Sequence, residues 1–200
     1  MQASKQSMGI ENRNKEVKRL FIAIDLPHEL KEYLYLAASE YFSGNNAVRV
    51  IPAENIHLTL KFLGSVDILK THRISVAIQS TSSNFGMFDY MISDRLNAFP
   101  SENSARIIFA GVKEGYGKIM EIFKVLETNL GKIRIKKEER RFVSHITVAR
   151  IRDRKNISGL LGSAGLAYDK PVRCDKLTLF ESILRPSGAQ YTILKEFALK

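Results

Sequence analysis

The chain has 200 residues, with 31 Lys and Arg against 21 Asp and Glu, so its formal net charge at pH 7 is +10. Hydrophobic residues make up 44% of the chain, which is enough to bury a core and excludes disorder for most of its length. No apolar run approaches the ~20 residues of a membrane-spanning helix, and a single cysteine excludes an internal disulfide. These properties predict a cytoplasmic protein without membrane contact.

The first half of the chain begins with a polar segment and then alternates strand and helix patterns. Residues 1–18 lack apolar periodicity and are expected to form a flexible leader. Short apolar runs predict strands at 19–25, 48–50 and 56–63, and apolar residues at helical spacing predict helices at 28–42 and 67–79.

The second half contains more strand patterns than helix patterns. Extended segments are predicted at 85–99, 106–112, 142–151, 176–184 and 190–199, with helices at 116–130 and 156–166. Because several neighbouring strands are joined by short turns, the pattern favours an α+β fold with antiparallel sheets over a doubly wound fold. No linker divides residues 19–200, so we expect a single domain.

Two short segments with the same pattern lie 88 residues apart, one around His57 and the other around His145. Each reads His-x-Thr with apolar neighbours, apart from Ser144 before the second histidine, and each lies in a predicted strand. Since side chains alternate between the two faces of a strand, His57 and Thr59 share one face, as do His145 and Thr147. The repeat predicts two pseudo-symmetric lobes of antiparallel sheet with outer helices, whose polar faces meet in a central cleft.

Such a cleft suits acid–base chemistry at a phosphodiester. One imidazole can accept a proton while the other donates one, and Thr59 and Thr147 can donate hydrogen bonds to the non-bridging phosphate oxygens. Arg150 is suited to bidentate contact with phosphate, but in an ideal strand it lies on the opposite face from His145. It reaches the cleft only if the strand bends or ends after Val148.

Other chemistries fit the sequence less well. The His-x-Thr spacing is not a zinc spacing, no glycine-rich phosphate loop is present, and a serine-type nucleophile elbow is missing. We therefore expect no metal and no cofactor. A single His-x-Thr in a strand is most often a structural histidine, and the matched flanks of the two copies weigh against that reading. Phe21, Phe62 and Phe142 are interpreted as core residues rather than as platforms for stacked bases.

Most of the excess positive charge lies in one segment. Between Lys132 and Lys155 there are ten basic residues and three acidic ones, so this segment carries +7 and surrounds the second His-x-Thr motif. A cluster of one sign attracts polyanions, which makes nucleic acid the first partner to consider, although a solvated face is the simpler alternative.

The motifs resemble those of a known family. Residues 55–64 and 141–150 are similar to the paired motifs of the 2H phosphoesterases, and within them to the RNA 2′,3′-cyclic phosphodiesterases, also called 2′-5′ RNA ligases. The resemblance extends over residues 19–200 and includes both ends of that range.

This resemblance implies a two-lobed α+β fold and metal-free hydrolysis of RNA 2′,3′-cyclic phosphate ends to 2′-phosphomonoesters. It makes His57 the proton donor, His145 the proton acceptor, and Thr59, Thr147 and Arg150 the phosphate-binding residues. The partner is then RNA with 2′,3′-cyclic phosphate ends, bound by a monomer. Ser144 and Val50 depart from many relatives, which carry Pro and Trp there.

Three functional hypotheses remain open at this point. The first is the cyclic phosphodiesterase, which could also run in reverse as a 2′-5′ RNA ligase. The second is a module that binds RNA ends without turnover. The third is a phosphodiesterase acting on a small cyclic nucleotide or an ADP-ribose cyclic phosphate.

Overall fold

The computed structural model describes residues 16–162, 164–186 and 188–200, and these form an α+β fold. The strands are β1 (Val17–Ile24), β2 (Val48–Val50), β3 (Leu58–Asp67), β4 (Phe88–Phe99), β5 (Ala105–Glu114), β6 (His145–Lys155), β7 (Val172–Cys174), β8 (Lys176–Arg185) and β9 (Gly188–Ala198). The helices are α1 (His28–Tyr41), α2 (Thr71–Ser82), α3 (Tyr116–Lys132) and α4 (Ser158–Leu161), with 3₁₀ turns η1 (Ala53–Asn55), η2 (Ile68–Lys70) and η3 (Glu102–Ser104).

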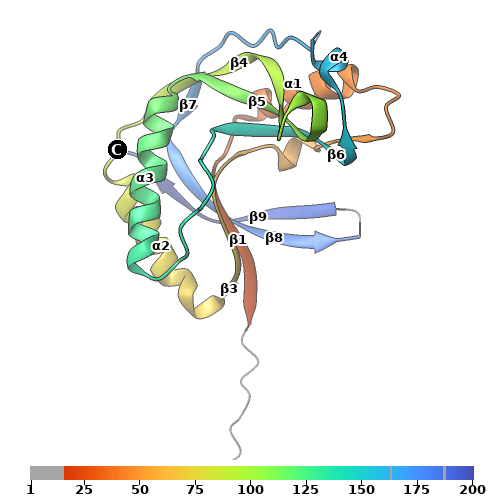
Figure 1. The fold of residues 1–200 in the computed structure, drawn as a ribbon. Coiled ribbons are helices and arrows are strands. Elements are labelled where there is room, and N and C mark those ends of the chain that lie inside the picture. The colour runs from red at the N-terminus through yellow and green to blue at the C-terminus, as the bar shows by residue number, and fades with distance from the viewer. Residues whose placement is uncertain (1–15, 163, 187) are drawn as a thin grey trace, which may run out of the picture.

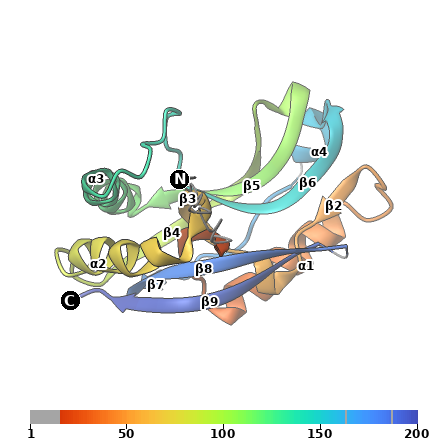
Figure 2. The ribbon, with the colours of Figure 1, turned by 90° about the horizontal axis from the view of Figure 1, so that it is seen from below.

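All nine of these strands join one antiparallel sheet that curls into a half-barrel. The strand order is β7-β4-β5-β6-β3-β1-β8-β9, and β2 pairs with β6 beside this path. Figures 1 and 2 show the curl from two directions, with β5 and β6 forming one arm and β8 and β9 the other. The space between the arms opens to one side.

The two halves of the sheet meet between β3 and β6 at a single residue pair, Leu58 opposite Ile146. Both side chains are fully buried in the main core. This pair lies at the middle of both His-x-Thr motifs. The two halves of the sheet are therefore arranged pseudo-symmetrically on either side of this pair. The expected lobes are therefore the two halves of one continuous sheet.

The long helices cover the outer face of the curled sheet. Helices α2 and α3 lie against one another, as Figure 1 shows, and bury Ile74 and Ile78 from α2 and Ile122 and Leu126 from α3. Helix α1 contributes buried leucines to the same core cluster. Apolar side chains of the sheet, among them Leu58 and Ile146, pack with these helices in the main core.

The elements agree with the sequence prediction, apart from their boundaries and one strand. The predicted helix at 67–79 begins at Thr71, because the Asp67 carboxylate accepts a hydrogen bond from the Leu69 amide and closes the separate turn η2 first. Strand β7 was not predicted. Strand β1 starts at Val17, within the predicted leader, and residues 1–15 of that leader lie outside the described residues.

Within the described ranges no helix is long and apolar enough to cross a membrane.

Candidate active site

The structure brings the two His-x-Thr motifs together on the inner face of the sheet. Leu58 and Ile146 face each other and both point into the core. Alternation then directs the flanking residues to the opposite, inner face. His57 and Thr59 flank Leu58 in the chain, and His145 and Thr147 flank Ile146, so all four lie around this one pair. The predicted meeting of the two polar faces in one cleft follows from this single pair.

Both imidazoles are fixed by the same backbone contact. His57 Nδ1 lies 2.9 Å from the carbonyl oxygen of Asn55, and His145 Nδ1 lies 2.7 Å from that of Val143. A carbonyl oxygen can only accept, so Nδ1 carries the hydrogen in each ring. In the neutral form, Nε2 is then the unprotonated nitrogen. In each ring, Nδ1 is therefore held by the backbone, and Nε2 is the nitrogen available for proton transfer.

His57 lies in an aromatic surrounding. Its ring centroid is 4.7 Å from that of Phe21 and 5.3 Å from that of Tyr191, while its Nε2 is 2.9 Å from Thr59 Oγ1. Phe21 in turn stacks on Phe180, with 5.0 Å between the ring centroids. Burial lowers the pKa of His57 to about 4, against the opposing effect of the Asn55 carbonyl. His57 is therefore neutral near pH 7 in the free protein.

His145 has a corresponding aromatic pair on the other half of the sheet. Phe99 and Phe109 stack with 4.2 Å between their centroids, and their rings lie 5.2 and 5.5 Å from the His145 ring, both edge-on. Burial lowers the pKa of His145, and the positive charge of Arg150 acts in the same direction. Among the described residues, none forms a hydrogen bond with Nε2 of His145.

Arg150 reaches the inner face because strand β6 contains a bulge. Opposite β6, Phe109 pairs with Thr147 and Ile108 pairs with Ala149, which leaves Val148 as an extra residue. Both Val148 and Ala149 are fully buried, and the alternation resumes one residue later. Arg150 therefore shares the inner face with Thr147 and is exposed there. The bend that the sequence analysis required after Val148 is this bulge.

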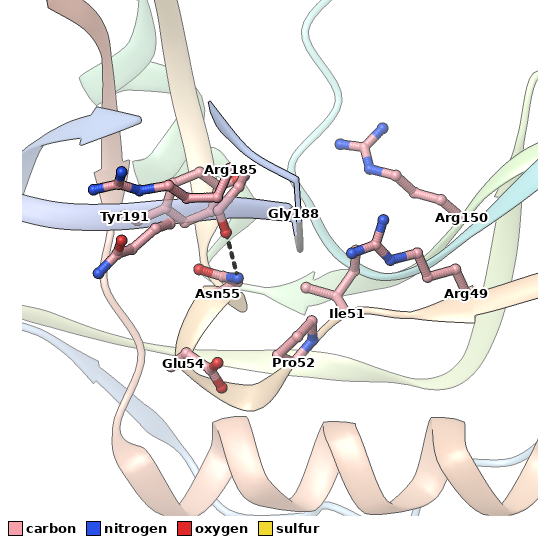
Figure 3. Close-up of a pocket in the computed structure, with 11 residues that line it drawn as sticks. Arg49, Ile51, Pro52, Glu54, Asn55, Arg150, Arg185, Gly188 and Tyr191 are labelled. Carbon is pink, nitrogen blue, oxygen red and sulfur yellow. Dashed lines mark hydrogen bonds between the residues drawn. The ribbon is translucent and has the colours of Figure 1, made fainter. Parts of the chain in front are cut away.

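A cavity of about 570 Å³ adjoins the motifs, next to the β8–β9 hairpin. Its lining includes three arginines, Arg49, Arg150 and Arg185. Arg49 lies directly opposite Arg150 in the β2–β6 pairing, and both side chains extend toward the hairpin at Gly188, as Figure 3 shows. Arg185 points away from this pair in the same view. Such a cavity suits an anionic ligand of nucleotide size.

Comparison with known proteins places the chain in a family. The family model described as LigT like phosphoesterase matches residues 24–109 and 111–191. The chain belongs to this family. It is 28% identical over 185 residues to a Methanocaldococcus jannaschii protein named RNA 2′,3′-cyclic phosphodiesterase, over 90% of this chain and 99% of that one. A protein of the same name from Escherichia coli is 27% identical over 184 residues, over 92% and 98% of the two chains.

Solved structures of LigT-like phosphoesterases have the same fold. The E. coli LigT structure in its apo form matches with a TM-score of 0.76 and 25% identity, over 92% of this chain and 99% of that one. The E. coli LigT structure complexed with 3′-AMP matches with a TM-score of 0.74 and 24% identity over the same shares. These findings confirm the family resemblance and the α+β fold inferred from the sequence.

Several residues of this LigT-like site were not singled out by the sequence analysis. Asn55 holds His57 through its carbonyl and donates from Nδ2 to the Ala189 carbonyl at 2.9 Å, which ties the β8–β9 hairpin to the first motif. The structure also shows Arg49, an exposed residue of β2, in the lining of the cavity. The pairing of β2 with β6 sets Arg49 beside Arg150.

The interpretation of the phenylalanines as core residues was partly wrong. Phe21 is buried, although in a small inner-face cluster with Phe180 rather than in the main core. Phe142 packs at the edge of the main core and stacks on Phe123, whereas Phe62 is 61% exposed.

No group of three or more His, Cys, Asp or Glu side chains that could hold a metal ion occurs within the described parts of the chain.

Proposed function

We propose that this LigT-like phosphoesterase hydrolyses RNA 2′,3′-cyclic phosphate ends to 2′-phosphomonoesters with His57 and His145 as its acid–base pair. The observation that carries the proposal is the pairing of Leu58 with Ile146, which sets both histidines on one inner face. The names of the relatives, RNA 2′,3′-cyclic phosphodiesterase, support the same substrate. So does the 3′-AMP found in a complex of E. coli LigT.

In the proposed reaction, Nε2 of His145 takes a proton from water as the water oxygen attacks phosphorus. The new bond joins that oxygen to phosphorus, and the bond from phosphorus to the ribose 3′-oxygen breaks. His57 gives its Nε2 proton to the departing 3′-oxygen, which leaves a 3′-hydroxyl and a 2′-phosphate. Thr59 and Thr147 donate hydrogen bonds to the non-bridging oxygens, and Arg150 balances their negative charge.

The asymmetry between the two imidazoles supports this division of roles. Nε2 of His145 has no hydrogen-bond partner among the described residues, so it is open to a water molecule. His57 must be protonated to act as the acid, although burial lowers its pKa to about 4 in the free protein. An anionic phosphate beside His57 favours the imidazolium, so substrate binding supplies the charge that the acid needs.

The substrate class follows from the charge of the molecule. A net charge of +10, with +7 between Lys132 and Lys155, suits a polyanion better than a small cyclic nucleotide. We infer that residues 19–200 act as one domain, as a monomer in the cytoplasm and without a metal. The same groups would also carry out 2′-5′ RNA ligation if the 5′-hydroxyl of a second RNA replaced water: His145 would take the hydroxyl proton as its oxygen bonds to phosphorus, and His57 would protonate the departing 3′-oxygen.

The test is the fate of an RNA oligonucleotide that ends in a 2′,3′-cyclic phosphate, incubated with excess EDTA. We expect the wild-type protein to release a 2′-phosphate end, and His57→Ala and His145→Ala each to be slower by about 10²- to 10⁴-fold. His72→Ala, which removes an exposed histidine on α2, is the matched control and should keep full activity.

The alternatives give different results in the same experiment. An RNA that binds and keeps its cyclic end would contradict hydrolysis and favour the binding module. An RNA that neither binds nor reacts, together with turnover of an ADP-ribose cyclic phosphate, would favour the small-substrate enzyme. Near-complete activity in either histidine variant would contradict the acid–base pair.

A further inference from the structure

Asp25 follows strand β1 at the point where this strand meets the first motif. Ile24, the last residue of β1, pairs with Leu58, the first residue of β3. Asp25 and His57 are the next residues of the two segments beyond this pair, at the same end of the antiparallel ladder. The fold therefore brings a carboxylate from outside both motifs to the histidine that is the proposed acid.

The pairing of β1 with β3 is regular at this end. Ala23 pairs with Thr59, so the register is uninterrupted up to the last pair before Asp25. Strand β3 does carry an extra residue, Leu60, but this bulge comes only after these pairs. The position of Asp25 beside His57 therefore follows from a continuous stretch of the ladder.

Asp25 forms an ion pair with Lys31 across the turn between β1 and α1. Lys31 Nζ lies 2.6 Å from Asp25 Oδ1, and the two side chains are only 15% and 19% exposed. The Lys31 amide donates a hydrogen bond to the Pro27 carbonyl at 3.1 Å, which places Lys31 in the first turn of α1. Because the ammonium extends from a helical turn, it holds the carboxylate in a fixed position.

Helix α1 also packs against the 3₁₀ turn η1, which leads into the first motif. Asn55, the last residue of η1, holds the His57 ring through its carbonyl. The ion pair and the histidine are thus carried by neighbouring elements that contact one another. Their relative position is set by the fold rather than by a bound substrate.

The charged groups that act on His57 come from three different elements. They are Asp25 at the end of β1, Lys31 on α1 and His145 on β6. The side chains in contact with the His57 ring carry aromatic groups or a hydroxyl, namely Phe21, Phe180, Tyr191 and Thr59. Asp25 is the anion among the three charged groups.

The effect of this anion opposes that of burial. Burial lowers the pKa of His57 to about 4, while the Asn55 carbonyl and the Asp25 carboxylate act to raise it. Lys31 and His145 act to lower it, and the effect of Asp25 is larger than that of Lys31. The carboxylate therefore favours the imidazolium more than its partner ammonium disfavours it.

We propose that Asp25 and Lys31 form a positioning pair for the acid of the reaction, in which the carboxylate stabilises the imidazolium of His57 and the ammonium fixes the carboxylate. The inference rests on the proposed function, because it concerns the proton that His57 gives to the 3′-oxygen. Two anions then act on the imidazolium when RNA is bound, the substrate phosphate and Asp25. Asp25 itself transfers no proton.

The first test follows the protonation of His57 by NMR in the full chain, with ¹⁵N-labelled histidine. The His145→Ala background slows hydrolysis, and the probe is adenosine 2′,3′-cyclic phosphate, whose phosphodiester keeps one negative charge during the titration. In this complex, Asp25→Asn should lower the pH at which His57 is half-protonated by about 0.5 to 1 unit. Lys31→Met should raise this pH by a smaller amount. A general loss of structure would not give opposite shifts for the two partners of one ion pair.

The second test measures kcat for the same cyclic nucleotide against pH, with the His145 side chain intact. A lower half-protonation pH leaves less imidazolium above that pH and the same amount below it. Asp25→Asn should therefore lower kcat by about 3- to 10-fold at pH values above the half-protonation of His57 and leave it within about twofold at lower pH. An ion pair with a purely structural role would change kcat alike at every pH.

Glu29→Gln is the matched control, because it also removes one negative charge from the first turn of α1. The Glu29 carboxylate pairs with Lys170 instead and is 64% exposed. This variant should shift neither the half-protonation of His57 nor the dependence of kcat on pH.

An unchanged half-protonation pH in Asp25→Asn would overturn the proposal, and so would shifts in the same direction in both variants. If Asp25→Asn does not fold, Lys31→Met decides, since an upward shift supports the pair and no shift contradicts it. Should the wild-type protein hydrolyse neither the cyclic nucleotide nor an RNA cyclic end, the proposed function fails. Titration of His57 in the free protein needs no turnover and then still decides the pair, because a lower half-protonation pH in Asp25→Asn supports it and an equal one contradicts it.

Discussion

Thr59 and His57 are joined by a hydrogen bond of 2.9 Å between Oγ1 and Nε2, and this bond has no described counterpart in the other motif. The neutral imidazole of His57 is unprotonated at Nε2, so the threonine hydroxyl donates. Protonation of His57 reverses this arrangement, because the imidazolium then donates from Nε2. Thr59 is thereby released to donate to a phosphate oxygen at the step where His57 holds its proton.

Replacing either motif threonine should slow the chemical step. We expect Thr59→Val and Thr147→Val each to lower kcat by about 10²-fold, because each removes one hydroxyl donor from the charged transition state and keeps the volume of the side chain. Thr59→Ser and Thr147→Ser keep the donor and should retain most of the activity. Steady-state kinetics on a mononucleotide cyclic phosphate measures this, and a change confined to KM would contradict the assignment.

The inner-face motifs could be found from sequence because they obey simple alternation over four residues. His57, Leu58 and Thr59 alternate as a strand requires, and their repetition around His145 predicted a shared cleft. The one pair that joins the halves, Leu58 with Ile146, is a long-range contact that alternation does not specify. The sequence therefore predicted two lobes, and the structure shows that these lobes are the two halves of one continuous sheet.

Alternation failed where each strand carries an extra residue. A bulge leaves no mark in an apolar run, so Phe62 was read as a core residue and Arg150 as lying on the wrong face. The aromatic pair around His145 could not be predicted from the sequence either. Phe99 and Phe109 come from β4 and β5, and only the pairing of these strands brings the two rings together.

Substrate binding should take up a proton near pH 7. Burial lowers the pKa of His57 to about 4, so the ring is neutral in the free protein, and a bound phosphate anion raises its pKa again. Calorimetry of a 2′,3′-cyclic nucleotide binding to the His145→Ala protein, in buffers of different ionisation enthalpy, should show uptake of up to about one proton. The double variant His57→Asn/His145→Ala should lose this uptake. Binding without proton uptake would contradict the acid role of His57.

The half-buried His57 should also make the fold sensitive to acid. The pKa of His57 is about 4 in the folded protein and near 6.5 in the unfolded chain, so the unfolded state binds more protons between these values. The stability that the neutral ring contributes is complete above pH 6.5 and is lost as the pH falls toward 4, by up to about 3 kcal/mol. Urea unfolding at pH 7 and pH 4.5 should show a smaller loss for His57→Asn, which keeps a donor for the Asn55 carbonyl. Equal losses in both proteins would exclude a titrating His57 as the cause.

The ion pair of Lys61 and Glu127 should be a structural link between the two motifs. Both side chains are largely buried, at 4% and 11% exposure, and the same carboxylate holds the Glu138 amide of the segment that leads to His145. Lys61→Met leaves a buried carboxylate without its cation and should cost about 3–5 kcal/mol of unfolding free energy. The double variant Lys61→Met/Glu127→Gln removes both charges, keeps an acceptor for the Glu138 amide, and should cost at least about 1 kcal/mol less than the sum of the single variants. Additive costs in denaturant unfolding would show that the pair is not coupled, and the connection between β3 and the second motif would then depend on packing alone.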